Sequence, residues 1–485
     1  MIKRFYLGFL IVLTIPFLAS CTTNPATGQK QFTALMSPAQ ENQIGAQEHE
    51  KVIQQFGLYN NPEISTYVSQ VGQKVVANTE RPDVQYKFFV VDSPIVNAFA
   101  LPGGYIYLSR GLLALANNEA EMAAVLAHEA GHITGRHSAE RYSRGVVTTL
   151  GASILSAAIG SNGASQVLGV GTDLYLKSYS RGQESQSDTL GIRYLSRAGY
   201  HPYGMTGFLK NLNADTVLES KIDGQGGNDP ASSYFSTHPA TAQRVATTAQ
   251  ESQAYPQSGV INRDVYLRKI EGMTYGDSAE QGFSRGQSFY HPKLGFTFNV
   301  PQGFKIINQP SHVIAVNQNQ NALVIFDMAA NKINASPVSF LRDVWMKDND
   351  VKGVESIAIN GMHAAAGVIE GKINGQAMDI RLIAIEWGGN QFARFQMAMP
   401  KNISSAMLNE LKKTSYSFRR LSAAEKHSLK PYRIDLVLAK SGDSVASLAS
   451  RMAVKDYAQD RFRVLNGLDA NEDVQAGVLY KIIVE

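Results

Sequence analysis

The sequence is poor in the features that mark several protein classes. Its 485 residues include one cysteine, Cys21, so a disulfide framework is excluded. Its formal net charge is only +4, with no basic patch, so no nucleic-acid partner is expected. No repeat of solenoid period is present. The hydrophobic content of 44% is ordinary for a globular protein, and the length predicts about two to four domains.

The N-terminal segment predicts export from the cytoplasm. Lys3 and Arg4 precede an apolar run over residues 5–18, an order that is typical of a signal peptide. The run is short for a membrane span, although a transmembrane anchor and a plain secretory signal are the alternatives. Removal of the signal with its two basic residues leaves a net charge of +2.

The end of this segment resembles a bacterial lipobox. The letters Leu-Ala-Ser-Cys end at Cys21, the only cysteine, which favours modification over disulfide formation. The resemblance implies that Cys21 is lipidated and becomes the first mature residue. More than one acyl chain would anchor the protein firmly to a membrane. Thr22 resembles the following residue of lipoproteins sent to the Gram-negative outer membrane.

An H-E-x-x-H motif at residues 128–132 indicates a metal site. Residues four apart share one face of a helix, so His128 and His132 can bind one zinc ion. Glu129 then lies close enough to act as a general base. Helical spacing of apolar residues and a cap at Asn118 predict the helix. The alternative is a pair of surface histidines on an ordinary amphipathic helix.

A third ligand is expected because catalytic zinc usually has three protein ligands. The sequence predicts a helix that runs from Glu184 to a stop at Gly199 and places Asp188 one turn after Glu184. We expect Glu184 to bind the metal. We expect Asp188 to accept a hydrogen bond from a ligating histidine, preferentially His128. Without the two histidines, a Glu and an Asp at this spacing would be typical of a solvated helix face.

Four motifs together resemble one protein family. HEAGH at 128–132, SRGQESQSD at 180–188, AGYHP at 198–202 and STHPATAQR at 236–244 are similar to the zinc metalloproteases that include the CAAX prenyl endopeptidases, HtpX and BepA. The similarity extends from about residue 24 to residue 258. It implies one zinc ion per chain, bound by the ligands His128, His132 and Glu184, with Glu129 as the base.

The resemblance also implies roles for His238 and Arg244. His238 would face the zinc, where it would either donate to the developing oxyanion or fill the fourth coordination position in a self-inhibited resting state. Arg244 would orient His238 or the nearby carboxylates. Independently of the family, a histidine before a proline is typical of the start of a helix.

The family resemblance further implies that one segment is the edge strand of the active-site cleft. This segment comprises Asn97, Ala98, Phe99, Ala100 and Leu101. An exposed strand edge binds extended peptides through main-chain hydrogen bonds, so we expect unfolded or loosely structured substrates.

Two further features lie near the motif. His137, nine residues after His128, is predicted to lie on the opposite face of the same helix and to be structural. The uncharged segment from Gly145 to Thr172 is interrupted by Gly and Ser, and each half is too short to span a membrane. It is predicted to form a packed or mobile hairpin near the cleft.

The overall prediction is an α+β chain. A zincin-like, mostly helical metalloprotease domain with a small active-site sheet is followed by an α+β accessory domain and a small βααβ domain that resembles LysM. The predicted parts are a signal peptide at 1–20, a lipidated polar tether at 21–36, the metalloprotease domain at 37–258, a linker at 259–289, the accessory domain at 290–421 and the LysM-like domain at 431–485. LysM domains bind peptidoglycan or chitin; the alternative is an interaction domain without affinity for sugars.

These features predict a zinc-dependent endopeptidase. It would be anchored to the outer membrane, face the periplasm and cleave unfolded or misassembled cell-envelope proteins, with peptidoglycan as a second candidate partner. The alternative is a chaperone-like or glycan-binding scaffold whose zinc site is structural or kept shut by His238. Glu129 favours the enzyme, because a purely structural site needs no base.

Overall fold

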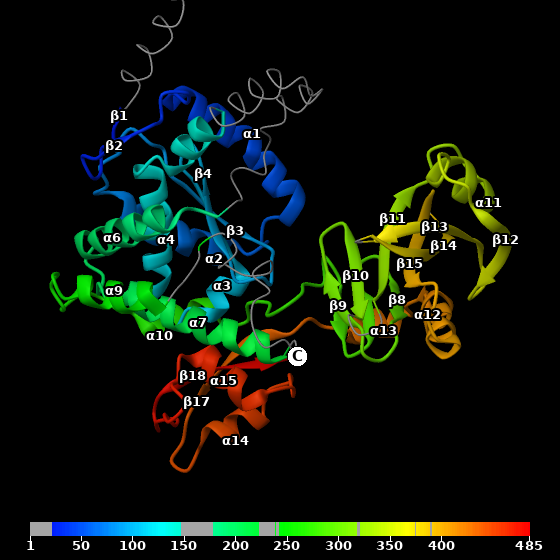
Figure 1. Ribbon diagram of the computed structural model, residues 1–485. Coiled ribbons are helices and arrows are strands. Elements are labelled where there is room, and N and C mark those ends of the chain that lie inside the picture. Colours follow the sequence, from blue (N-terminus) through cyan, green and yellow to red (C-terminus); the bar gives the residue numbers. More distant parts are fainter. Residues whose placement is uncertain are drawn as a thin grey trace, which may run out of the picture. The chain divides into compact units, whose positions relative to one another are not determined.

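The computed structural model describes residues 22–146, 178–222, 238, 242–317, 321–373, 375–388 and 390–485. The chain forms two compact units: Met1–Tyr275 together with Arg433–Val484, and Gly276–Tyr432 together with Glu485. Figure 1 traces these parts along the sequence. The predicted signal peptide, Cys21 and nearly all of the predicted hairpin lie outside the described residues.

The first unit begins with a folded hairpin. Strand β1 (Thr22–Thr23) pairs antiparallel with β2 (Lys30–Gln31). Asn24 exposes only 2% of its surface. Its side chain donates a hydrogen bond to Gly135 O and accepts one from Ala26 N–H. The prediction of a polar tether over residues 21–36 is therefore wrong for residues 22–36, which fold back onto the unit.

Two capped helices follow, and each begins at a cap residue followed by proline, a sequence pattern that predicts a helix start. Helix α1 (Pro38–Phe56) starts at a capping box formed by Ser37 and Gln40, and α2 (Pro62–Val76) starts at Asn61. In each case proline occupies the first turn, where a missing N–H costs nothing. The predicted apolar face of α2 is buried, including Ile64, Tyr67, Val68, Val71 and Val75.

A three-stranded sheet lies beside these helices. Its order is β3 (Lys87–Val91), β5 (Tyr105–Ser109) and β4 (Ala98–Leu101), with β3 parallel and β4 antiparallel to β5. Apolar residues alternate from Val84 to Val90, a pattern that predicts a strand, but the strand begins only at Lys87. Strand β4 forms one edge of the sheet.

The other described helices of this unit surround a central helix, α4 (Glu119–Thr134), every residue of which is buried. In Figure 1 α4 lies among α2, α6 and α7, and it contacts each of them. Further helices of this unit include α3 (Arg110–Leu115), α6 (Arg181–Arg197), α7 (Gly204–Ile222), α9 (Ala242–Ser252) and α10 (Arg263–Ile270). None of the described helices combines the length and hydropathy of a membrane span.

The C-terminal segment joins this same unit. The predicted strand–helix–helix–strand order is present as β17 (Arg433–Leu438), α14 (Val445–Ser450), α15 (Ala458–Asn466) and β18 (Leu479–Val484). Strands β17 and β18 pair antiparallel. Helix α15 packs against α3 and α7, so the segment is docked onto the helical unit.

The second unit is rich in antiparallel strands. One sheet has the order β12-β13-β14-β15-β11-β10-β9, and a smaller one has the order β16-β8-β7-β6. The strands are β6 (Phe283–Arg285), β7 (Ser288–His291), β8 (Phe296–Asn299), β9 (Lys305–Asn308), β10 (His312–Asn317), β11 (Ala322–Ala330), β12 (Lys352–Ile359), β13 (Met362–Ile373), β14 (Gln376–Gly388), β15 (Gln391–Pro400) and β16 (Arg419–Arg420). The helical segments are α11 (Pro337–Ser339), the π-helix η5 (Phe340–Trp345), α12 (Ser405–Ser417) and α13 (Ala423–Ser428).

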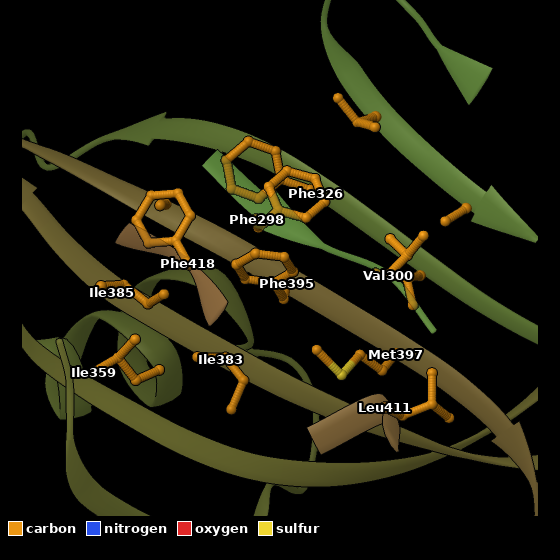
Figure 2. Close-up of a cluster of buried hydrophobic side chains, with 14 of the residues drawn as sticks. Phe298, Val300, Phe326, Ile359, Ile383, Ile385, Phe395, Met397, Leu411 and Phe418 are labelled. Carbon is orange, nitrogen blue, oxygen red and sulfur yellow. The ribbon is translucent and has the colours of Figure 1, made fainter. Parts of the chain in front are cut away.

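An aromatic core holds the second unit together. Figure 2 shows Phe298, Phe326, Phe395 and Phe418 gathered over the strands, and each is at most 3% exposed. Ring centroids of Phe326 lie 4.9 Å from those of both Phe298 and Phe395. Contacts of this kind add to the free energy gained by burying the rings.

Candidate metal centre

Helix α4 presents the two histidines of the motif on one face. Its first turn is capped by Asn118, whose side chain accepts a hydrogen bond from Glu121 N at 2.9 Å. Further along, Nε2 of His128 lies 3.0 Å from Nε2 of His132, and the two residues are 1% and 2% exposed. The alternative of two surface histidines is therefore wrong.

Helix α6 brings Glu184 to the same place. Its start is fixed by a capping box of Ser180 and Gln183. The Glu184 oxygens lie 3.5 Å from Nε2 of His128 and 3.5 Å from Nε2 of His132. Burial opposes ionisation of Glu184, but the charge of His238 and hydrogen bonds from the histidines hold its pKa well below the usual value. A carboxylate in this position adds an anionic oxygen donor.

A glycine on α4 allows α6 to approach closely. A Cβ atom on Gly131 would lie 3.1 Å from both Cα and O of Ser187. A side chain at residue 131 would therefore require α6 to shift by a few tenths of an ångström.

His238 reaches the cluster from a distant part of the sequence. Its Nδ1 lies 3.0 Å from Glu184 Oε1 and 3.3 Å from His128 Nε2, and its Nε2 lies 3.4 Å from Glu129 Oε1. Ligand atoms of His128, His132, Glu184 and His238 all lie within 4.8 Å of one another. Buried imidazole nitrogens and a carboxylate oxygen are ligands that zinc prefers, so this donor set fits one zinc ion.

The side chains of Asp188 and Arg244 contact the candidate metal ligands. His128 Nδ1–H donates to Asp188 Oδ1 at 2.9 Å, which is the contact expected from the helix spacing. Arg244 donates to both oxygens of Asp188 at 2.7 Å and lies 2.9 Å from Glu184 Oε2. Burial opposes the charge of Asp188, but Arg244 and His128 outweigh it and lower the pKa of Asp188. A carboxylate so held fixes the histidine ring and leaves its other nitrogen available to a metal.

The predicted position of His137 on the opposite face of the motif helix is wrong. Helix α4 ends at Thr134, and Arg136 has a left-handed backbone with φ of 52°, so the chain turns before residue 137. His137 therefore lies beside the cluster, with its Nδ1 2.9 Å from Nδ1 of His132. Burial lowers the pKa of His137 to about 4, which keeps its ring neutral.

No sequence pattern predicted that Tyr179 lies at this site. Its ring stacks on His132 with centroids 3.7 Å apart and 22° between planes, and Arg141 lies 4.0 Å from the Tyr179 centroid. Tyr179 comes just before α6, where no spacing rule connects it with the motif helix. Its proximity to the SRGQE sequence was the only available signal.

The predicted substrate strand lies close to the ligands. A pocket lined by Ala100 and Leu101 of β4 is also lined by His132 and Tyr179. Residues 98–101 nevertheless expose at most 5% of their surface, and Asn97 is partly buried. A peptide could pair with this edge only after it is uncovered.

The amino-acid sequence around the candidate ligands also indicates a peptidase. Residues 62–252, which include all four candidate ligands, match the family described as Peptidase family M48. This segment therefore resembles a peptidase domain of family M48. Among the residues that the structure describes, the candidate ligands all lie within this segment.

Several proteins are similar to the M48 domain and its surroundings. The chain is 28% identical over 263 residues to the beta-barrel assembly-enhancing protease of Escherichia coli (strain K12), which covers 52% of each chain. It is 33% identical over 174 residues to the Yersinia pestis protein of the same name, or 34% of this chain and 36% of that one. It is 34% identical over 199 residues to the mitochondrial metalloendopeptidase OMA1 of Arabidopsis thaliana, or 40% and 38%. The matches thus span about half or less of these relatives' length.

Proposed function

We propose that the chain is a zinc-dependent endopeptidase. The observation that supports this most is the buried convergence of His128, His132 and Glu184 with Glu129 directly beside them. Glu129 is fully buried within α4 and lies 3.4 Å from His238. A carboxylate adjacent to three metal ligands is the arrangement found in zinc metalloproteases.

Each residue then has a distinct part in the reaction. When bound, zinc supplies a Lewis acid that polarises the scissile carbonyl and lowers the pKa of water. Glu129 accepts a proton from the attacking water and passes it to the leaving amine. Asp188 holds His128 in the tautomer that presents Nε2 to the metal, and Arg244 keeps Asp188 ionised and forms an ion pair with Glu184.

His238 is proposed to repress this activity at rest. Its Nδ1 lies among the ligand atoms, where it can fill the fourth coordination position. The covered edge of β4 is consistent with a closed state. After displacement by substrate, the same imidazole would donate to the developing oxyanion, so its role is dual with net repression.

Unfolded or misassembled cell-envelope proteins are the proposed substrates. A strand edge such as β4 selects extended backbone through main-chain hydrogen bonds. Two similar proteins are named beta-barrel assembly-enhancing proteases, which supports a role in the envelope. We further propose that acylated Cys21 anchors the chain to the outer membrane and that the catalytic unit faces the periplasm.

The second candidate function is that of a chaperone-like or peptidoglycan-binding scaffold with a latent zinc site. The βααβ order of residues 433–484 favours it, because that order resembles LysM. One measurement separates the candidates. Envelope proteins should accumulate in cells that carry Glu129→Gln in place of the wild type; an unchanged proteome would favour the scaffold.

Metal analysis tests the ligand assignment directly. Purified protein that lacks residues 1–21 should contain about one zinc per chain, and His132→Ala should lose it. His363→Ala, at an exposed position in the second unit, is the matched control. Full zinc occupancy in His132→Ala would refute the assignment.

A further inference from the structure

We propose that Asn24, in the hairpin that opens the described chain, is a positioning residue for His132. It acts through two intermediate side chains, Gln186 and His137, and fixes which nitrogen of His132 carries the proton. The proposal rests on the proposed role of His132 as a metal ligand. It gives residues 22–31 a function in the metal centre that no sequence motif indicates.

Two backbone N–H groups fix the orientation of the Asn24 side-chain amide, because a backbone N–H can only donate a hydrogen bond. Ala26 N–H donates to Asn24 Oδ1 at 2.9 Å, and Thr27 N–H does so at 3.3 Å. The opposite side of the Asn24 amide must therefore be its NH₂ group. This group donates to Gln31 Oε1 at 3.1 Å, to Gly135 O at 3.2 Å and to Gln186 Oε1 at 3.3 Å. Asn24 is 2% exposed, so water does not compete for these bonds.

The hairpin also holds the other end of the Gln186 amide. Gln186 Nε2 donates to Gln29 Oε1 at 3.3 Å. The Gln186 oxygen is thereby directed to His137, whose Nε2 lies 2.7 Å away. Because a carbonyl oxygen only accepts, His137 must carry a proton on Nε2.

The tautomer of His137 then determines that of His132. A neutral His137 with its proton on Nε2 presents a lone pair on Nδ1, 2.9 Å from Nδ1 of His132. His132 must donate its Nδ1–H there, and its Nε2 keeps a lone pair directed at the metal cluster. Gly135 makes this arrangement possible, since a Cβ atom there would lie 2.5 Å from His137 Nε2.

The two motif histidines therefore reach the same tautomer by different routes. His128 donates to the carboxylate of Asp188, a common partner for a metal-binding histidine. His132 donates to a second imidazole whose orientation depends on the N-terminal hairpin. The segment next to the proposed acylation site is thus part of the metal centre.

Asn24→Asp is the decisive variant. It keeps the oxygen that accepts from Ala26 and Thr27, so the turn is retained, but it places a second oxygen against Gln186 Oε1 and also against Gln31 Oε1 and Gly135 O. Gln186 should rotate its NH₂ group towards His137, which reverses both histidine tautomers. We expect zinc affinity to fall by about 10–100-fold, the usual loss for a partner of a ligating histidine. Asn78→Asp, at an exposed position, should leave affinity unchanged.

Gln186→Glu is the matched control variant. Its carboxylate accepts from both Asn24 and His137 and cannot rotate into a donor, so zinc affinity should stay close to wild type. A purely structural role of Asn24 in the hairpin predicts the opposite order, with Asn24→Asp tolerated. Affinity is measured on full-length protein in detergent by competition with a chelator. Near wild-type affinity of a folded Asn24→Asp would overturn the proposal.

A second measurement needs no substitution. Nitrogen-15 chemical shifts of the histidines in metal-free wild-type protein should show His132 protonated on Nδ1. Protonation on Nε2 would refute the relay even if Asn24→Asp failed to fold. If the wild-type protein bound no zinc, the proposed enzymatic function would fail, whereas the shifts would still decide the relay.

Discussion

Replacement of Lys481 by Met should destabilise the first unit. Lys481 lies on β18 and is fully buried. Its Nζ donates to Ala114 O and Ala116 O, both at 2.7 Å, at the C-terminal end of α3. Carbonyls at a helix end have no partner within the helix, so the lysine satisfies groups that would otherwise be buried without one.

The expected loss in the free energy of unfolding follows from contributions of opposite sign. Two hydrogen bonds from a charged donor contribute about 3–6 kcal/mol together. Burial of the ammonium opposes this and lowers the pKa of Lys481 to about 7, although the charge of Glu121 partly restores it. Met removes that desolvation penalty but leaves the buried Glu121 without this compensating cation. We expect a net loss of about 3 kcal/mol in the free energy of unfolding, at the lower end for a broken buried pair.

The two units can be monitored separately. Both tryptophans, Trp345 and Trp387, lie in the second unit, so fluorescence in urea reports that unit alone. Hydrogen exchange of peptides from α3 and α4 reports the first unit. Lys481→Met should weaken protection in α3 and α4 and leave the fluorescence midpoint unchanged. Lys440→Met, at an exposed position of the same segment, is the control. Unchanged protection in Lys481→Met would refute the reasoning.

Three further predictions concern other parts of the chain. His238→Ala should cleave an unfolded protein faster than wild type at matched zinc content; a loss of about 10²–10³-fold would instead indicate an oxyanion donor alone. Burial and the charge of Glu219 raise the pKa of Asp215 to about 7, so folding favours its protonated form and stability should fall as pH rises from about 4 to 7. Asp215→Asn should flatten this dependence in thermal melts, and an unchanged profile would contradict it. Cys21→Ser should abolish acylation; mass spectrometry that finds an unmodified thiol in the wild type would overturn the lipoprotein prediction.

Local patterns predicted the central part of the site. The spacing of His128 and His132, the cap at Asn118 and the spacing of Glu184 and Asp188 depend on helix geometry alone. The structure brings these residues together because α4 and α6 pack closely. Proline and its preceding cap likewise predicted the starts of α1 and α2.

Features that depend on distant parts of the chain were not predicted. Asn24 finds its partners 111 and 162 residues away, so its segment resembled a solvated tether. Lys481 binds carbonyls more than 360 residues away, although lysine in a short strand is typical of a surface. His137 was misplaced because periodicity does not reveal where a helix ends, and Arg136 adopts a left-handed conformation that its residue type rarely takes.

The secondary structure of the second unit was predicted in part. Residues 296–300 and 322–326 alternate in a pattern that predicts strands, and β8 and β11 are present there. Pro337 is typical of a helix start, and the helix begins there as α11 but continues as the π-helix η5. This change in winding depends on packing and has no periodic signal in six residues.

Hydrolysis by Glu129→Gln tests the central claim most directly. Wild type, Glu129→Gln and the exposed control Glu63→Gln are compared on one unfolded protein, with zinc measured in each sample. We predict that Glu129→Gln keeps its zinc and loses peptide-bond cleavage, because the ligands stay and the base is removed. Glu63→Gln should behave as the wild type does. Cleavage by zinc-loaded Glu129→Gln at the wild-type rate would contradict the account.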